Sequence, residues 1–114
     1  MPLRLLPVLW LVLLASARAS GISGGVCVIV GAKDAGQALA IAKQGHAVVH
    51  CLVADPQTRD ALRRSGLFAD VLAGSRLPYV DNLVNTLIVR DGSAVPKDEM
   101  LRVLVPHGVA LVGG

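Results

Sequence analysis

The sequence predicts an open, parallel α/β sheet of about five strands. Two observations predict it: five short apolar runs are typical of buried strands, and helix start and stop signals lie between most of them. Strands of a parallel sheet are buried on both faces, so they appear as continuous apolar runs. Of the 114 residues 54% are hydrophobic and 17% charged, which excludes a disordered chain and fits one small domain.

The first apolar run and its helix form the first repeat of this pattern. Residues 25–31 are apolar and end in glycine, and Asp34 is placed to cap a helix over residues 35–44. Gly45 suits the left-handed residue that follows a helix. Residues 47–53 are the second apolar run and predict the second strand.

The second helix has the clearest start signal in the chain. Asp55 and Pro56 form an N-cap and first-turn proline pair, and the helix is expected to reach about Ser65, with Gly66 as its stop. A weaker third strand is predicted at residues 70–73.

The second half of the chain predicts two more strands and one helix. Residues 77–82 are too few for a full crossover helix, and residues 85–89 are rich in β-branched side chains, which favours a strand. Pro96 is expected in the first turn of a helix that ends at residues 106–108, before a fifth strand at residues 109–112. In that helix we expect acidic residues at the positive end, Asp98 and Glu99, and a buried face of Met100, Leu101, Val103 and Leu104.

The N-terminus has the pattern of a secretory signal peptide. Arg4 supplies the positive start, residues 5–15 form the apolar core, and a small-x-small site favours cleavage after Ala19. An uncleaved anchor is the alternative, but the run is shorter than the roughly 20 apolar residues that cross a bilayer. We therefore expect a signal peptide at residues 1–19, a domain at residues 20–114 with no stable membrane span, and a secreted or periplasmic location.

The charge balance excludes a large basic surface. The net charge is +3, and removal of residues 1–19, which hold two arginines, leaves nine basic and eight acidic side chains, a charge of +1. No basic face then attracts nucleic acid, so nucleic acid is not an expected partner.

The two cysteines lie inside apolar runs. Cys27 belongs to the first predicted strand and Cys51 to the second, which favours inert core thiols over the alternative of a disulfide bridge. Neither has a histidine or cysteine at ligand spacing, so no metal site is predicted.

The expected ligand crevice of such a sheet lies beyond the carboxyl ends of its strands. The loop at residues 31–36 has glycines five apart, which lets the backbone approach a ligand at a helix N-terminus. It lacks the Gly-Lys-Ser/Thr ending of a phosphate-binding loop and the close Gly-x-Gly pair of the dinucleotide fingerprint. A tight strand-to-helix turn without a ligand is the equally weighted alternative.

The other polar residues do not form a catalytic set. His46 and His50 are four apart, a spacing that brings side chains together only on a helix, and His50 falls in a predicted strand, so a structural role is favoured. Tyr79 and Asp81 either line the crevice or serve packing and turns. No Ser-His-Asp or Cys-His combination is evident, and no catalytic residue is predicted.

Two segments resemble motifs of the class I S-adenosylmethionine-dependent methyltransferases. Residues 77–85, Leu-Pro-Tyr-Val-Asp-Asn-Leu-Val-Asn, resemble the family's Leu-Pro-Phe-x-Asp-Asn-x-Phe-Asp segment, and residues 99–108 resemble its Glu-x-x-Arg-Val-Leu-Lys-Pro-Gly-Gly segment. With the first strand and loop, the resemblance covers residues 25–112. It implies a Rossmann-like sheet of order 3-2-1-4-5 with helices on both faces, the C-terminal strands missing, and the chain as a fragment of a longer protein.

The resemblance also implies where S-adenosylmethionine would bind. The corresponding positions are Gly31, Ala32, Lys33, Gly36, Asp55 and Ser75, and of the family's three motif glycines only Gly31 is retained. The sequence departs from the family at most of the acidic positions. Ile29 replaces the acid before the glycine-rich turn, the ribose-binding acid falls near Leu52, and Asp55 comes about three residues late, where helix capping is the commoner role.

These departures indicate weak cofactor binding, because a cationic cofactor with a ribose diol needs acceptors. We therefore expect a non-catalytic, methyltransferase-like module that is a structural or docking part of a larger protein, with further domains of the same chain as its partners. The layout is similar to exported planctomycete proteins in which a degenerate methyltransferase-like domain precedes a PQQ-binding-like β-propeller. The alternatives are an active methyltransferase on a small molecule and a binder of another small molecule.

Overall fold

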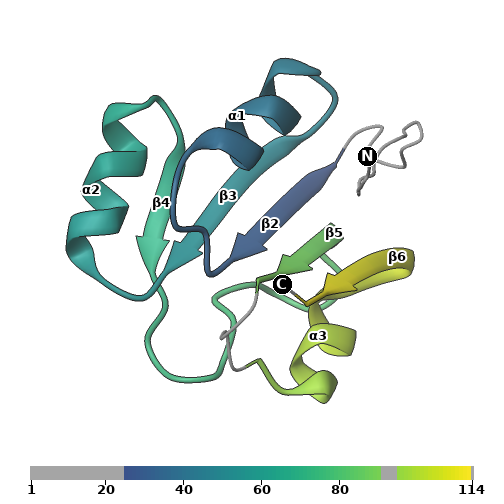
Figure 1. The fold of residues 1–114 in the computed structure, drawn as a ribbon. Helices are drawn as coiled ribbons and strands as arrows, with labels where there is room; N and C mark the ends of the chain where they lie inside the picture. Colours follow the sequence, from purple (N-terminus) through teal and green to yellow (C-terminus); the bar gives the residue numbers. More distant parts are fainter. Residues whose placement is uncertain (1–24, 91–94, 114) are drawn as a thin grey trace.

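The computed structural model describes residues 25–90 and 95–113 (Figure 1). The expected signal peptide at residues 1–19 lies outside these ranges. Within them, no helix has the length and hydropathy that crossing a membrane requires.

Five parallel strands form one sheet in the order β4-β3-β2-β5-β6. Their bounds are Val26–Val30 for β2, Val48–Val53 for β3, Phe68–Val71 for β4, Val84–Val89 for β5 and Leu104–Val112 for β6. Numbered by their place in the chain, the order is 3-2-1-4-5, which confirms the predicted sheet. The three central strands are almost wholly buried, as expected for continuous apolar runs.

Helices cover both faces of the sheet, as predicted (Figure 1). On one face, α1 (Gly36–Lys43) and α2 (Pro56–Arg64) pack over β2, β3 and β4 with a core that includes Ile29 and Leu62. On the other face, α3 (Lys97–Val103) and the segment at residues 72–83 bury Leu77 and Val103 against β2 and β5.

The predicted helix ends are mostly confirmed. Asp55 caps α2, and Gly45 and Gly66, which follow the C-cap residues of α1 and α2, have positive φ angles of 71° and 89°. The prediction for Asp34 was only partly right, because Ala35 is the N-cap of α1. The Asp34 carboxylate instead accepts the N–H of Gly36 at 2.9 Å, so it still satisfies one free donor of that helix.

Two boundaries predicted from the sequence were wrong. The third strand lies at Phe68–Val71, two residues earlier than predicted, since it pairs with β3 from His50 onward. The last helix ends at Val103, and residues 106–108 lie inside β6. The pairing of these residues with β5 is irregular. Proline has no backbone N–H to donate, and an edge strand tolerates it because such a strand pairs on one side only.

The buried face of α3 is narrower than predicted. Val103 is fully buried and Met100 packs partly against the core, but Leu101 is 63% exposed. Pro96 precedes the helix as its N-cap with extended backbone angles rather than lying in its first turn. Asp98 and Glu99 do occupy the first turn.

Both cysteines lie in the core between the sheet and the first two helices. Cys27 and Cys51 have no exposed surface, and they are free thiols rather than a disulfide. Burial raises the pKa of the Cys27 thiol to about 12 and raises that of Cys51 as well. Because the thiolate is the reactive form, both groups are expected to be inert in the folded chain.

We expect a thiol reagent such as Ellman's reagent to modify neither cysteine while the chain is folded. Both are expected to react in denaturant, where burial is lost and the thiol pKa returns toward its ordinary value. The measurement compares modification at pH 8 with and without urea. Rapid modification of either thiol in the native chain would contradict this packing.

Candidate functional site

The loop after β2 is the candidate cofactor turn. Gly31 has a φ of 86°, a backbone conformation that favours glycine, and its N–H donates to the carbonyl oxygen of Leu52 at 2.8 Å. Ala32 is 5% exposed and packs into the core beneath α1. Lys33 is exposed. The turn therefore presents a cationic side chain at a position where the methyltransferase motif has a glycine.

Asp55 follows β3 at the same edge of the sheet, and its carboxylate is used to cap α2. One oxygen accepts the backbone N–H of Thr58 at 2.8 Å, and the other accepts the Thr58 hydroxyl at 3.1 Å. The hydrogen bond from the Thr58 backbone is the main cause of a pKa below the usual range for this carboxyl. The predicted capping role of Asp55 is confirmed.

The described residues that follow β4 and β5 at this edge carry no carboxylate from residue 72 to 76 or at residue 90. Gly74 and Ser75 follow β4 and are exposed, with a positive φ of 73° at the glycine. Arg90 follows β5 and donates from its guanidinium to the side-chain oxygen of Gln37 on α1 at 3.0 Å. Within the described residues, no group of three or more histidine, cysteine or acidic side chains is placed to hold a metal ion.

Solved structures resemble this fold over most of the chain. A Methanococcus maripaludis protein assigned as an S-adenosyl-L-methionine-dependent methyltransferase matches 85% of this chain and 51% of its own, with 19% identity and a TM-score of 0.72. A Galdieria sulphuraria protein assigned as a sarcosine dimethylglycine methyltransferase matches 81% and 41%, with 19% identity and a TM-score of 0.66. The Aquifex aeolicus SAM-dependent methyltransferase matches 75% and 54%, with 19% identity and a TM-score of 0.60.

The chain has the fold of the S-adenosylmethionine-dependent methyltransferases. It spans about half the length of the solved chains that it matches. No family model and no curated protein matches the sequence. At 19% identity the similarity establishes the methyltransferase fold and leaves cofactor binding and catalysis to be argued from this chain's own residues.

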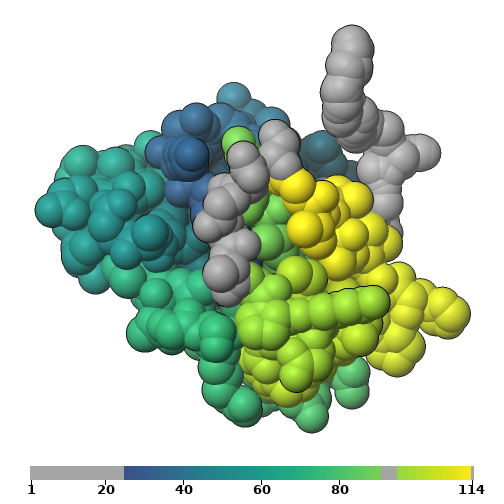
Figure 2. All heavy atoms as spheres, turned by 60° about the horizontal axis from the view of Figure 1, so that its bottom comes forward, coloured from purple at the N-terminus to yellow at the C-terminus, as the bar shows by residue number. Residues whose placement is uncertain are grey.

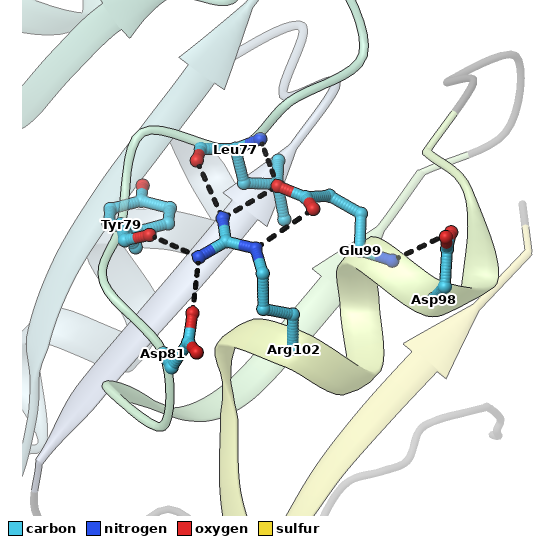
Figure 3. Close-up of polar contacts among 6 residues, drawn as sticks. All are labelled: Leu77, Tyr79, Asp81, Asp98, Glu99 and Arg102. Carbon is cyan, nitrogen blue, oxygen red and sulfur yellow. Dashed lines mark hydrogen bonds and ion pairs between the residues drawn. The ribbon is translucent and has the colours of Figure 1, made fainter.

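The two segments that resemble methyltransferase motifs contact one another through Arg102 (Figure 3). Its guanidinium donates to the Glu99 carboxylate at 2.6 and 2.9 Å and to the Asp81 carboxylate at 2.9 Å. It also donates to the backbone carbonyl oxygens of Tyr79 at 2.8 Å and Leu77 at 3.1 Å. Arg102 therefore fastens the segment at residues 72–83 to α3, and the two lie side by side in Figure 2.

Glu99 completes this contact from the same helix. One oxygen of its carboxylate accepts the backbone N–H of Leu77 at 2.8 Å in addition to the bonds from Arg102. The hydrogen bond from Arg102 is the main cause of a pKa lowered to about 2. Both residues belong to the segment that resembles a methyltransferase motif, but the resemblance assigned a role to neither. Their i, i+3 spacing places them on one side of a helix, and this spacing was the signal in the sequence for their contact.

This shift makes the stability of the fold depend on pH in a defined range. The Glu99 carboxylate is expected to contribute fully above its ordinary pKa of 4.5 and to lose its contribution as the pH falls toward about 2. Glu99→Gln should therefore reduce the fall in Tm between pH 4.5 and 2. Thermal unfolding followed by circular dichroism measures this, with Asp60→Asn on the surface of α2 as the control. An unchanged pH profile in Glu99→Gln would contradict the assignment.

His50 is part of a polar cluster that the sequence did not predict. Its Nδ1 lies 2.5 Å from the Tyr79 hydroxyl oxygen, and its Nε2 lies 2.7 Å from a carboxylate oxygen of Asp70. Arg63 on α2 donates to the other oxygen of Asp70 at 2.9 Å. The predicted structural role of His50 fits these contacts. Tyr79 packs against it, and its backbone N–H also donates to the carbonyl oxygen of Leu77 at 2.8 Å in a turn. His46 is exposed.

The pairing of β3 with β4 explains the cluster. His50 lies opposite Phe68, so Asp70, two residues further, points to the same face of the sheet. The third strand was predicted to begin at residue 70. Its pairing with β3 from His50 onward could therefore not be predicted. With the correct strand bounds, the His50 and Asp70 pair follows from the alternation of side chains.

Asn85 stands where the methyltransferase motif has an aspartate at the start of its fourth strand. Its side-chain oxygen accepts the backbone N–H of Val26 at 2.9 Å and so joins the start of β5 to the start of β2. This is a structural role at the amino ends of the strands, away from the edge with the candidate cofactor turn.

Proposed function

We propose that this chain is a non-catalytic, methyltransferase-like module that acts as a structural or docking part of a larger, exported protein. The observation that carries the proposal is the use of Asp55. Both oxygens of this carboxylate accept hydrogen bonds from Thr58 and cap α2, so the acidic side chain nearest to the expected ribose position is oriented by the helix.

The remaining groups at the carboxyl edge fit S-adenosylmethionine poorly. The cofactor carries a positive sulfonium and ribose hydroxyls, which call for carboxylate acceptors. Among the described residues, the turns after β2 and β5 offer Lys33 and Arg90, and the turn after β4 offers Ser75. The Asp34 carboxylate beside Lys33 accepts the N–H of Gly36 at the start of α1. The two cations oppose binding of a sulfonium, because like charges repel, and Asp34 is the one described carboxylate in these turns that is not used to cap α2.

Export and further domains belong to the same proposal. The signal-peptide pattern of residues 1–19 supports a secreted or periplasmic location, where little S-adenosylmethionine is available. The similarity to exported planctomycete proteins supports additional domains of the same chain, such as a β-propeller, as partners.

Calorimetric titration tests the cofactor question directly. The 114-residue chain is titrated with S-adenosylmethionine up to millimolar concentration, beside an active methyltransferase of the same fold as a positive control. We expect saturable heat from the control and none from this chain. Saturable binding with a stoichiometry of one would overturn the proposal and favour the alternative of an active methyltransferase on a small molecule, which the two motif-like segments support.

Asp55→Ala separates capping from cofactor binding in the same assay. Loss of the cap is expected to lower Tm by about 4–8 °C, the usual effect for a helix cap in a domain of this size. Gln57→Ala, an exposed change on the same helix, should leave Tm almost unchanged. A variant with unchanged Tm that loses a binding signal present in the parent chain would show that Asp55 holds a ligand.

A further inference from the structure

Strand β6 is an edge of the sheet that is apolar on both faces. Within the described residues its one strand neighbour is β5, and Figure 1 shows it at the end of the sheet away from α1 and α2. Residues 109–112 pair with the buried residues 86–89 of β5, yet all four are exposed. Val109, Leu111 and Val112 expose 46%, 54% and 67% of their surface. A continuous apolar run of this kind is typical of a strand inside a sheet rather than at its edge.

The pairing with β5 shows which faces these side chains occupy. Leu111 lies opposite Ile88, which belongs to the core under α1 and α2. Val112 lies opposite Val89, which belongs to the core on the side of α3. None of the described residues in the core under α1 and α2 comes from β6. The edge strand therefore presents apolar side chains on both faces of the sheet.

The two edges of the sheet differ in the features that prevent pairing with another strand. Strand β4 has four residues and carries Asp70, whose carboxylate forms an ion pair with Arg63. Short length and charge are common ways in which proteins block a sheet edge. Residues 104–112 of β6 include no lysine, arginine, aspartate or glutamate. Pairing of β4 with its own copy would bring a second set of the same charges close, whereas pairing of β6 with its own copy would not.

The backbone of β6 determines how a second strand can pair with it. The N–H of Gly113 donates to the carbonyl oxygen of Val89 at 3.0 Å, so the odd-numbered residues of this stretch point their backbone groups at β5. Ala110 and Val112 then point theirs at the free edge, where no hydrogen bond of the described residues uses them. In an antiparallel pair, Ala110 of one copy and Val112 of the second copy exchange two hydrogen bonds, and the symmetry repeats them. Both free residues of each copy are then satisfied.

We propose that the β6 edge is a two-fold interface between two copies of this chain, with the strands antiparallel and Leu111 at the axis. An axis perpendicular to the sheet keeps each face continuous, because paired residues point to the same face. Leu111 then meets Leu111 of the second copy on one face, and the small Ala110 meets the larger Val112 on the other. The irregular residues 105–108 lie outside the paired stretch. The inference does not depend on the proposed function.

Sedimentation velocity of the full chain tests whether the interface forms. The paired stretch is short, so we expect it to bury less than the about 1,200 Å² of a stable complex and to give a dimer that dissociates on dilution. Between about 5 and 500 μM the weight-average mass should rise from near that of a monomer toward that of a dimer. A monomer over the whole range would overturn the inference and leave this edge to a partner of another kind.

Leu111→Lys and Phe68→Lys distinguish this edge from other surfaces. Both variants replace an exposed apolar side chain on an edge strand and add the same charge. Leu111→Lys places two like charges at the axis and should remain a monomer, whereas Phe68→Lys on β4 should dimerise as the parent chain does. A dimer that persists in Leu111→Lys would show association through another surface and overturn the inference.

Cysteine variants test the register without adding charge. Both native cysteines are buried and free, so an introduced thiol is the one accessible to a mild oxidant. Opposed residues that do not share hydrogen bonds have Cα atoms about 4.5 Å apart, within the range of a disulfide, so Leu111→Cys should link two copies. Ala110→Cys, which faces Val112, and Phe68→Cys on the other edge should link at least about tenfold more slowly. Equal rates in the three variants would indicate random collision and overturn the inference.

Discussion

Arg102→Ala is expected to lower Tm by more than about 10 °C, a large effect for a domain of this size. The substitution removes the hydrogen bonds to Asp81 and to the carbonyl oxygens of Leu77 and Tyr79. It also leaves the Glu99 carboxylate, whose side chain is only 13% exposed, without its cationic partner. An ion that loses its partner in a poorly solvated position costs more than a surface contact is worth.

Arg59→Ala is the matched control for this prediction. Arg59 forms an ion pair with its neighbour Asp60 on the surface of α2, and such exposed pairs contribute little. Thermal unfolding of the two variants beside the parent chain gives the comparison. Equal, small losses in both variants would show that Arg102 does not anchor the segment at residues 72–83. A double variant, Glu99→Gln with Arg102→Ala, is expected to regain part of the loss, because no unpaired carboxylate remains.

The sheet could be predicted from the sequence because its signals are local. Continuous apolar runs such as residues 25–31 report burial on both faces, and the Asp55 and Pro56 pair fixes the start of α2. The strand order was supplied by the resemblance, since local patterns do not determine which strands are neighbours. The errors at Phe68 and at residues 106–108 fall where the two edge strands pair on one side only and their patterns are weak.

The polar contacts could not be predicted, because they join residues distant in sequence. The hydrogen bond between His50 and Tyr79 spans 29 residues, and the bond between Arg102 and Leu77 spans 25. Each bond depends on the path of a chain segment over the face of the sheet. Because that segment has no regular secondary structure, no hydrophobic periodicity in the sequence predicts its path. Asp55 was interpretable because capping is a local interaction between residues three apart.

Gly25→Ala is expected to destabilise the fold severely, because two independent constraints meet at this position. The residue has a φ of 75°, which is unfavourable for alanine, and a Cβ there would lie 1.9 Å from the side-chain oxygen of Asn85. That oxygen is fixed by its hydrogen bond to the N–H of Val26, so it cannot move away without losing the bond. Gly45 supplies the matched control, with a φ of 71° and no atom within 4 Å of the position that an alanine methyl group would take.

Comparison of the two variants separates backbone strain from collision. Gly45→Ala should show the cost of the positive φ alone, on the order of 1–2 kcal/mol, whereas Gly25→Ala should lose at least twice as much or fail to accumulate as folded protein. Asn85→Ala removes the obstructing side chain at the cost of one hydrogen bond. In combination with Gly25→Ala it should therefore cost less than the sum of the two single changes, measured by urea unfolding. Additive losses would mean that the methyl group and the Asn85 side chain do not collide.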